Sequence, residues 1–205
     1  MPTTFPRALT TSAKIKSQLG ISVSDFDAIL EGFIASASMF IENECNTRFK
    51  RATYTQEIYN GSYPDGSKKS VLVLKNAPLV QVTAFQYRTG NKDNPNWVDL
   101  PTINFQEIPE SASIQANIPA GIQNIRVSYV AGYLIDFTDI YDDTKHTLPF
   151  DISDLCERLV IRRFKKRESE GRSSESFNNS SITWSTELDA VDKAVLENYR
   201  RIFIS

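Results

Sequence analysis

Six cations lie close together near the C-terminal end of the chain, and they are the densest set of like charges in it. They are Arg158, Arg162, Arg163, Lys165, Lys166 and Arg167, with no acidic residue among them. On a helix, at about 100° per residue, Arg158 and Lys165 lie opposite the apolar side chains, whereas Arg163 and the last two cations share the apolar side. The run is typical of a solvated helix end, which the helix dipole favours, or of a surface that binds a polyanion or an acidic protein.

Histidine and cysteine, two residue types that often bind metals or act in catalysis, are sparse. The chain has one histidine and two cysteines, Cys45 and Cys156, which are far apart. A structural zinc site typically takes four such ligands at short spacings, so we expect no metal centre and no cofactor. Each cysteine lies in an apolar helical pattern, which predicts buried thiols and a reducing compartment. His146 could serve as a general base, but its polar neighbours favour a solvated loop histidine.

Two further patterns resemble those of enzymes. Asp142 and Asp143 are adjacent carboxylates, although nothing in the sequence predicts the apolar pocket that would separate their pKa values. Gly61 and Gly66 have the spacing of a phosphate-binding loop, but Ser67 occupies the position of the lysine and a strand pattern follows. We therefore expect a hairpin loop there, and an enzyme with a carboxylate-only site stays open as a hypothesis.

The composition of the chain indicates the kind of fold that positions these residues. Its 205 residues are 40% apolar and 11% aromatic with a net charge of −2, which predicts a globular fold and argues against binding to nucleic acid by bulk charge. The longest uncharged stretch, 111–125, is shorter than the roughly 20 apolar residues of a membrane span, so no membrane association is expected. Residues 1–23 lack an unbroken apolar core, so we expect no signal peptide.

Helical patterns open the chain. A short helix around Ala13–Leu19 is expected to end at Gly20, and Ser24 has the character of an N-cap for a long helix over 25–46. Apolar residues recur in the long helix at i, i+3 and i+4 over nearly six turns. Because this stripe is broad, we expect the helix to pack against more than one neighbour.

A period of two replaces the helical pattern from about Thr53. Strands are predicted over 53–58, 71–74, 80–88, 97–100, 103–108, 113–116 and 122–133. Short strands separated by turn residues predict an antiparallel sandwich or a small barrel. After an acidic connector, a helix over 151–170, a Ser/Asn-rich loop over 171–185 and a last helix capped by Ser185 or Thr186 complete the pattern.

The expected fold class is α+β, with a helical bundle from both chain ends and an inserted antiparallel β-sandwich or small barrel. We assign residues 1–50 to the helical part, 51–135 to the inserted β part and 136–149 to the acidic connector. Residues 150–205 would complete the helical part, with a mobile loop at 171–185. Phe177 and Trp184 in this loop are large apolar groups, and Trp184 either folds back on the core or anchors a protein contact.

The order of several sequence stretches along the chain resembles that of a known protein family. They are the stretches 33–37, 41–49, 53–55, 72–82 and 125–133, followed by Leu148-Pro149 and Tyr199-Arg200-Arg201. Together they resemble the head–tail connector (adaptor) proteins of tailed bacteriophages, of the siphophage connector type. The resemblance covers nearly the whole chain, although the regions 89–118 and 136–149 are longer than in compact members of that family.

The resemblance implies a structural protein without catalytic activity. Such adaptors form a homo-oligomeric ring of roughly twelve subunits, which matches the cyclic symmetry of the portal. The ring docks on the portal protein, meets a tail-side neck or stopper/terminator protein and encloses double-stranded DNA. This chain would then act in the virion neck, between head and tail, and reside in the host cytoplasm during assembly.

The expected partner-binding residues are the six cations, Phe177, Trp184, Arg200 and Arg201. An alternative is a nucleic-acid-binding module that uses the basic helix 158–167, which predicts steep salt dependence of binding.

Overall fold

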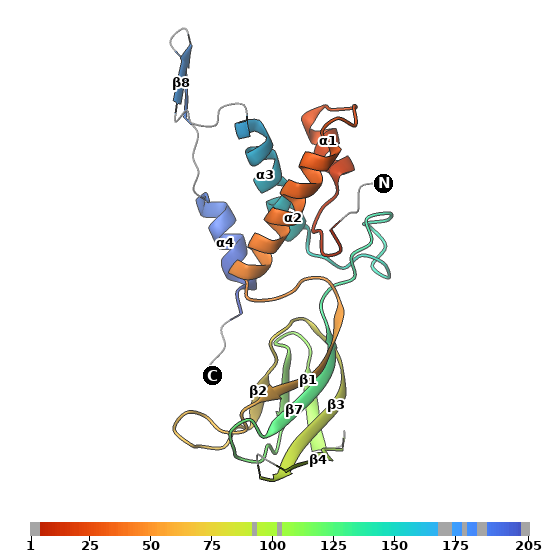
Figure 1. Cartoon of the computed structure of the whole chain (residues 1–205), viewed down its shortest axis with the longest axis vertical. Coiled ribbons are helices and arrows are strands. Elements are labelled where there is room, and N and C mark those ends of the chain that lie inside the picture. Colours follow the sequence, from red (N-terminus) through yellow and green to blue (C-terminus); the bar gives the residue numbers. More distant parts are fainter. Residues whose placement is uncertain are drawn as a thin grey trace. The chain divides into compact units, whose positions relative to one another are not determined.

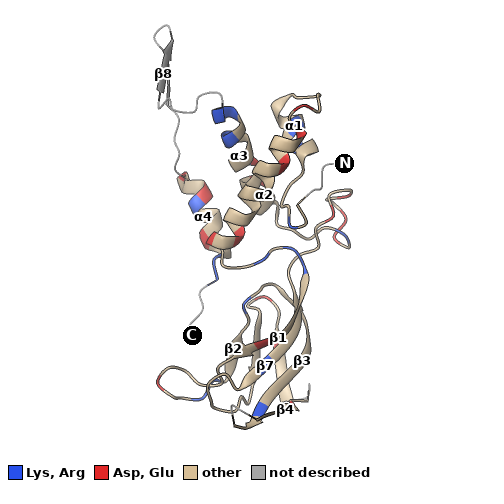
Figure 2. Ribbon diagram, in the orientation of Figure 1, with Lys and Arg blue, Asp and Glu red and all other residues tan. Residues whose placement is uncertain are grey.

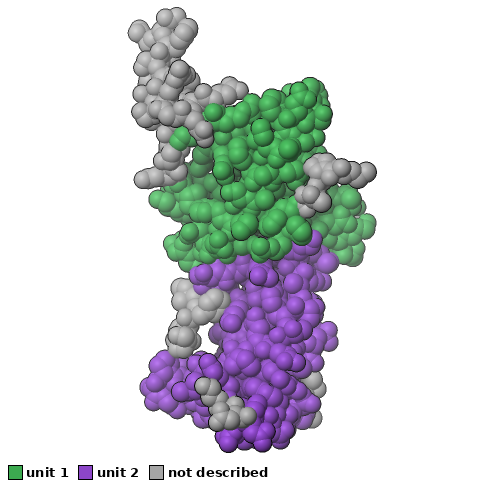
Figure 3. All heavy atoms as spheres, viewed as in Figure 1, with its two compact units in different colours: residues 1–45, 135–200 green, residues 46–134, 201–205 purple. Residues whose placement is uncertain are grey.

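The computed structural model describes residues 5–91, 94–101, 104–167, 174–177, 180–183 and 188–201. It is an α+β protein whose chain divides into two compact units (Figures 1 and 3). The helical unit comprises residues 1–45 and 135–200, and the β unit comprises residues 46–134 and 201–205. Each described helix is too short or too polar to cross a lipid bilayer.

The helical unit contains α1 (Ser12–Leu19), α2 (Asp27–Glu44), α3 (Phe150–Lys166) and α4 (Ala190–Tyr199). Helix α3 contacts the other three helices, and it buries a stripe of side chains that includes Leu155, Cys156 and Val160. Both cysteines are buried with free thiols, which confirms their prediction as core residues. Burial raises the thiol pKa of Cys45 to about 11 and that of Cys156 to about 12, so neither is a ready nucleophile.

Two helix starts differ from their predictions. Helix α2 begins at Asp27 rather than at Asp25, because the Asp27 amide bonds to the Ser24 carbonyl in a turn and its carboxylate accepts a hydrogen bond from Lys16 Nζ at 2.8 Å. Helix α4 is capped by Asp189 rather than by Ser185 or Thr186. The Asp189 carboxylate accepts a hydrogen bond from the Asp192 amide at 2.7 Å, which satisfies one of the open donors of the first turn.

The β unit contains two antiparallel sheets. The first has the order β1-β7-β3-β4, and the second has the order β2-β6-β5. The strands are β1 (Ala52–Tyr59), β2 (Val71–Val73), β3 (Leu79–Gly90), β4 (Pro95–Asp99), β5 (Phe105–Ile108), β6 (Ser113–Ala116) and β7 (Ile125–Ala131). Residues from both sheets, such as Leu72, Ile114, Phe85 and Tyr129, share one core. Every second residue of β7 is buried, as the alternating pattern predicts.

Part of the predicted loop 171–185 is a hairpin. Strands β8 (Ser174–Phe177) and β9 (Ser180–Thr183) pair antiparallel, and the other residues of this range lie outside the described ones. The prediction missed the hairpin because its strands are short and rich in serine.

The segment 136–149 is anchored rather than extended through solvent. His146 is only 4% exposed, and its ring lies 5.4 Å from that of Phe137, with Nδ1 at 3.0 Å from the Asp136 carbonyl oxygen. The expectation of a solvated loop histidine is therefore wrong, because a local apolar contact and a backbone hydrogen bond hold the ring inside. Leu148, 2% exposed, fixes the other end of the segment.

Candidate functional site

Helix α2 has two opposite faces of different character. One face packs into the helical unit through Leu30, Ile34 and Ile41, which are fully buried. About 180° away, at 100° per residue, lies a set that we call the α2 face. Its members are Ala28, Ile29, Gly32, Ala35, Ser36, Met39, Phe40 and Asn43, and none of them is charged.

The α2 face exposes large apolar side chains to water. Ile29, Met39 and Phe40 are 44%, 45% and 38% exposed. A water-facing helix surface normally carries charged or polar side chains, so this surface is typical of one that another protein covers. Covering it removes apolar area from water, which favours association by roughly 25 cal/mol per Å² before the entropy cost of binding is subtracted.

Gly32 lies in the middle of this face. Nothing lies within 4 Å of the position that its Cβ would take, so the fold of the chain leaves room for a side chain there. A glycine in a helix interior costs about 1 kcal/mol relative to alanine. The fold therefore does not require the glycine, whereas a partner packed closely on the helix backbone would.

Two of the six predicted cations hold α4 against α3. Arg158 Nη2 and Arg162 Nη2 each lie 3.0 Å from a carboxylate oxygen of Asp192, which is 0% exposed. Arg158 also pairs with Asp154, and Arg162 reaches Asp189 at 3.3 Å. The hydrogen bond from the Asp192 amide, followed by the Arg162 and Arg158 charges, holds the pKa of the Asp189 carboxyl below its usual 3.8. These arginines thus have structural partners inside the helical unit.

The later cations extend around the core on long side chains. The Arg163 guanidinium lies 4.6 Å from the centre of the Phe33 ring, and its Nη1 donates to Ser36 Oγ at 2.9 Å. The Arg167 guanidinium lies 3.7 Å from the ring centre of Phe164. Both contacts are cation–π geometries. Arg163 stays exposed, whereas Arg167 is half-buried.

The remaining predicted cations of α3 lie at its C-terminal end, where Figure 2 shows the ribbon in blue. Lys165 is exposed and has no hydrogen bond or ion pair to another residue of the described ranges. Lys166 is half-buried in the same turn. Because Ser36 belongs to the α2 face, Arg163 places positive charge at the rim of that face.

The other predicted site residues do not join this cluster. Arg200 bonds to the Glu44 carbonyl at 3.1 Å and to its carboxylate at 2.9 Å, at the end of α2. Arg201 belongs to the β unit, where it donates to the carbonyls of Leu74 and Ser111 at 2.8 and 3.1 Å. Burial lowers the pKa of Arg201.

The two aromatic candidates of the region 171–185 cannot be placed in the site. The backbone of Phe177 ends β8, and its side chain lies outside the described structure, as does the whole of Trp184.

A second exposed apolar group, which the sequence did not predict, lies at the start of α3. Tyr141 and Phe150 are 84% and 56% exposed, and their ring centres are 6.3 Å apart. Acidic residues surround them in the segment 136–149, where Asp139 and Asp143 are exposed. Lys145 compensates part of this charge, because its Nζ lies 2.8 Å from an Asp142 oxygen and 3.9 Å from an Asp139 oxygen. We call residues 136–150 the aromatic loop.

Glu157 and Asp192 are buried carboxylates of the kind that a carboxylate-only enzyme would need, and both have structural partners. Glu157, 2% exposed, accepts hydrogen bonds from Thr10, Gln18 and Ser153 and pairs with Lys14 at 2.7 Å. These contacts occupy both carboxylate oxygens, so the group has little capacity left to act on a substrate. Within the described ranges, no cluster of three or more His, Cys, Asp or Glu residues could hold a metal ion.

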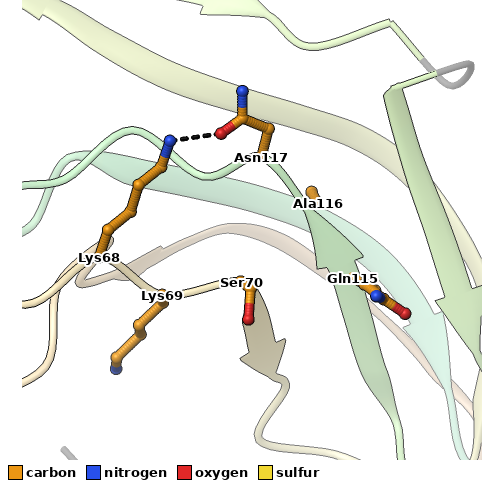
Figure 4. A pocket seen from close by; sticks show the side chains of 6 residues that line it. All are labelled: Lys68, Lys69, Ser70, Gln115, Ala116 and Asn117. Carbon is orange, nitrogen blue, oxygen red and sulfur yellow. Dashed lines mark hydrogen bonds between the residues drawn. The ribbon is translucent and has the colours of Figure 1, made fainter.

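A surface pocket of the β unit has no histidine, cysteine or carboxylate among its lining residues. It is lined by Lys68, Lys69, Ser70, Gln115, Ala116 and Asn117. Figure 4 shows that Lys68 donates to Asn117 on one side while Lys69 extends to the other. The two ammonium groups diverge, so they do not form a joint anion site.

The profile described as head completion protein matches residues 8–202. The chain belongs to the head completion protein family. This membership confirms the resemblance to head–tail connectors. No curated protein sequence matches this head completion protein.

Solved structures share the fold of this head completion protein. A chain in the neck of an empty GTA particle, computed with C6 symmetry, is similar with a TM-score of 0.54 and 16% identity. A chain in the virion of a native gene transfer agent (GTA) particle is similar with a TM-score of 0.53 and 14% identity. In both cases the match covers 98% of this chain and 92% of the other.

Proposed function

We propose that this head completion protein is a structural virion protein that forms a ring, docks on the portal and joins the DNA-filled head to the tail. Family membership supports a role in completing the head. The fold is shared with chains of the neck and virion of GTA particles, which supports a place in the neck. The proposal includes no catalytic activity and no cofactor.

The main observation that supports the proposed ring is the uncharged, exposed α2 face. A ring built by cyclic symmetry needs contacts that repeat identically between neighbouring copies. A rigid helix that buries one face in its own unit and exposes Ile29, Met39 and Phe40 on the other can supply such a contact. The helical bundle contributed by both chain ends would then form the ring wall, with the β part inserted between its helices.

The ring has partners on both sides and in its channel. We propose roughly twelve copies, matched to the cyclic symmetry of the portal. The C-terminal helices and the region 171–185, with Phe177 and Trp184, would contact the portal, and a tail-side neck or stopper/terminator protein would bind the opposite face. Double-stranded DNA would pass through the channel.

Support for a nucleic-acid-binding module at 158–167 is weaker. Arg158 and Arg162 are paired with Asp192 and with Asp154 and Asp189, which leaves fewer cations of the run for phosphates. Reversing the charge of Arg163 and Lys165 separates the two functions. Lost DNA binding with intact assembly on the portal would favour the nucleic-acid module.

The direct test is the mass of the complex with the portal. Mass photometry of the purified protein is carried out with and without the portal ring of its virus. We expect a gain in mass that corresponds to about one copy per portal subunit. The absence of any gain over a range of salt and protein concentrations would contradict the proposed function.

A further inference from the structure

We propose that the aromatic loop of one copy packs on the α2 face of the next copy, with Tyr141 and Phe150 as the anchors. This inference rests on the proposed ring, and it names the two surfaces that meet. A ring contact is heterologous, so each copy must present two different and complementary surfaces. The helical unit has an exposed apolar group at each of these two places.

The aromatic loop has the properties of an anchoring surface. Tyr141 and Phe150 are both exposed residues, and their rings lie side by side. Buried His146 and Leu148 fix the segment between them, so the rings are presented by an ordered loop. Aromatic side chains held in place in this way lose little conformational entropy on binding and are enriched among the residues that dominate interfaces.

The α2 face has the matching properties of a receiving surface. Gly32 leaves a gap in the row of side chains, with Ile29 on one side and Met39 and Phe40 on the other. An aromatic ring can rest on the exposed helix backbone at such a gap. This contact explains a glycine that the fold of the chain does not itself require.

Charges around the two surfaces are opposite in sign. Asp139 and Asp143 flank Tyr141 in the aromatic loop. Arg163 lies at the rim of the α2 face through its hydrogen bond to Ser36, and exposed Lys165 follows it. Such complementary charges steer two copies into a single orientation.

The two charged surfaces cannot neutralise each other within one copy. Phe150 begins α3 and Lys165 lies in its last turn, which is roughly 22 Å farther along the helix at 1.5 Å per residue. The acidic aromatic loop and the basic rim therefore lie at opposite ends of the same helix. A second copy can bring the acidic end of one α3 to the basic end of another, and repetition of that contact closes a ring.

The first experiment removes the anchor. Tyr141→Ala is compared with Ile122→Ala, which shortens a 74% exposed apolar side chain of the β unit. We expect Tyr141→Ala to raise the concentration at half-maximal assembly, alone or on the portal ring, by roughly tenfold or more. Ile122→Ala should leave it unchanged. Circular dichroism confirms folding, which truncation of so exposed a side chain should not affect.

The second experiment reverses the charges. One variant carries Asp139→Lys and Asp143→Lys, and the other carries Arg163→Glu and Lys165→Glu. Each variant alone should fail to assemble, because the aromatic loop and the rim of the α2 face then carry charges of the same sign and repel each other at every contact. A mixture should assemble into rings in which the two variants alternate in equal numbers. Glu110→Lys, at an exposed position of the β unit, is the control and should assemble like the wild type.

A third experiment tests proximity directly. Cysteines are introduced at Ser36 and Asp143, while native Cys45 and Cys156 stay buried. Mild oxidation of the double variant should give a ladder of covalent oligomers, whereas either single variant can link no more than two copies.

The outcomes distinguish this inference from the proposed function. Wild-type rings that tolerate Tyr141→Ala and both charge reversals would overturn the inference and leave the ring intact. Variants that keep the ring and lose only the binding of another neck protein would also overturn it, since the aromatic loop would then serve that protein. A wild-type chain that neither assembles nor binds the portal would instead contradict the proposed function.

Discussion

Gly32→Ala should stabilise the single chain and weaken the ring. The position lies inside α2, and its added Cβ meets nothing within 4 Å in the chain. Alanine should therefore raise the free energy of unfolding of the helical unit by about 1 kcal/mol, through helix propensity and the smaller entropy of the unfolded chain. In the ring, the added methyl group would meet the neighbouring copy. Overpacking of this kind would make the free energy of the contact between copies less favourable by about 1–3 kcal/mol. Even ~1 kcal/mol corresponds to a roughly fivefold weaker contact.

The assay measures both quantities on the same samples. Urea unfolding followed by circular dichroism at a concentration below assembly gives the stability, and mass photometry gives the concentration at half-maximal assembly. Ser17→Ala, at an exposed position of α1, is the matched control, because it adds helix propensity away from the α2 face. A Gly32→Ala chain that is more stable and assembles as well as the wild type would refute the assignment of this face as a close contact.

Three further predictions concern the contacts inside each unit. Asp192→Ala should lower the free energy of unfolding of the helical unit by about 1–3 kcal/mol in urea titrations, since it removes the buried carboxylate that both Arg158 and Arg162 contact; unchanged stability would contradict that role. The lowered pKa of Asp189 contributes stability above the unfolded value of 3.8 and loses it as the pH falls through the lower folded value, so Asp189→Asn should flatten the pH dependence of unfolding in that acidic window. Arg201→Ala should destabilise the β unit by about 1–3 kcal/mol through the loss of two carbonyl contacts, whereas Arg48→Ala, at an exposed position, should have little effect in the same thermal melts.

Much of the fold could be predicted because its signals are local. The i, i+3, i+4 spacing of apolar residues predicted α2. The alternation of apolar and polar residues predicted β7, in which every second residue is buried. The order of helices and strands along the chain was enough to indicate the family. The broad apolar stripe of α2 also indicated more than one neighbour, although the periodicity could not tell which side chains face outward. Ile29 and Leu30 are adjacent and similar, yet one is 44% exposed and the other is fully buried.

Features that depend on distant partners could not be predicted. Arg158 was expected at a partner-binding surface, but Asp192, which lies 34 residues farther along the chain, binds it inside the helical unit. His146 has polar neighbours in the sequence, and only the folded segment brings Phe137 against its ring. The exposure of Tyr141 likewise follows from the way the segment 136–149 is anchored, and that anchoring leaves no periodic signal.

The most direct test of the account is the oxidation rate of Met39 in the free chain and in the ring assembled on the portal. Met39 is 45% exposed in the single chain, so hydrogen peroxide should convert it readily to the sulfoxide. If the α2 face is the contact between copies, mass spectrometry should show oxidation at least roughly tenfold slower in the ring. An equal rate in the free chain and in the ring would contradict the central claim that this face is covered when the neck assembles.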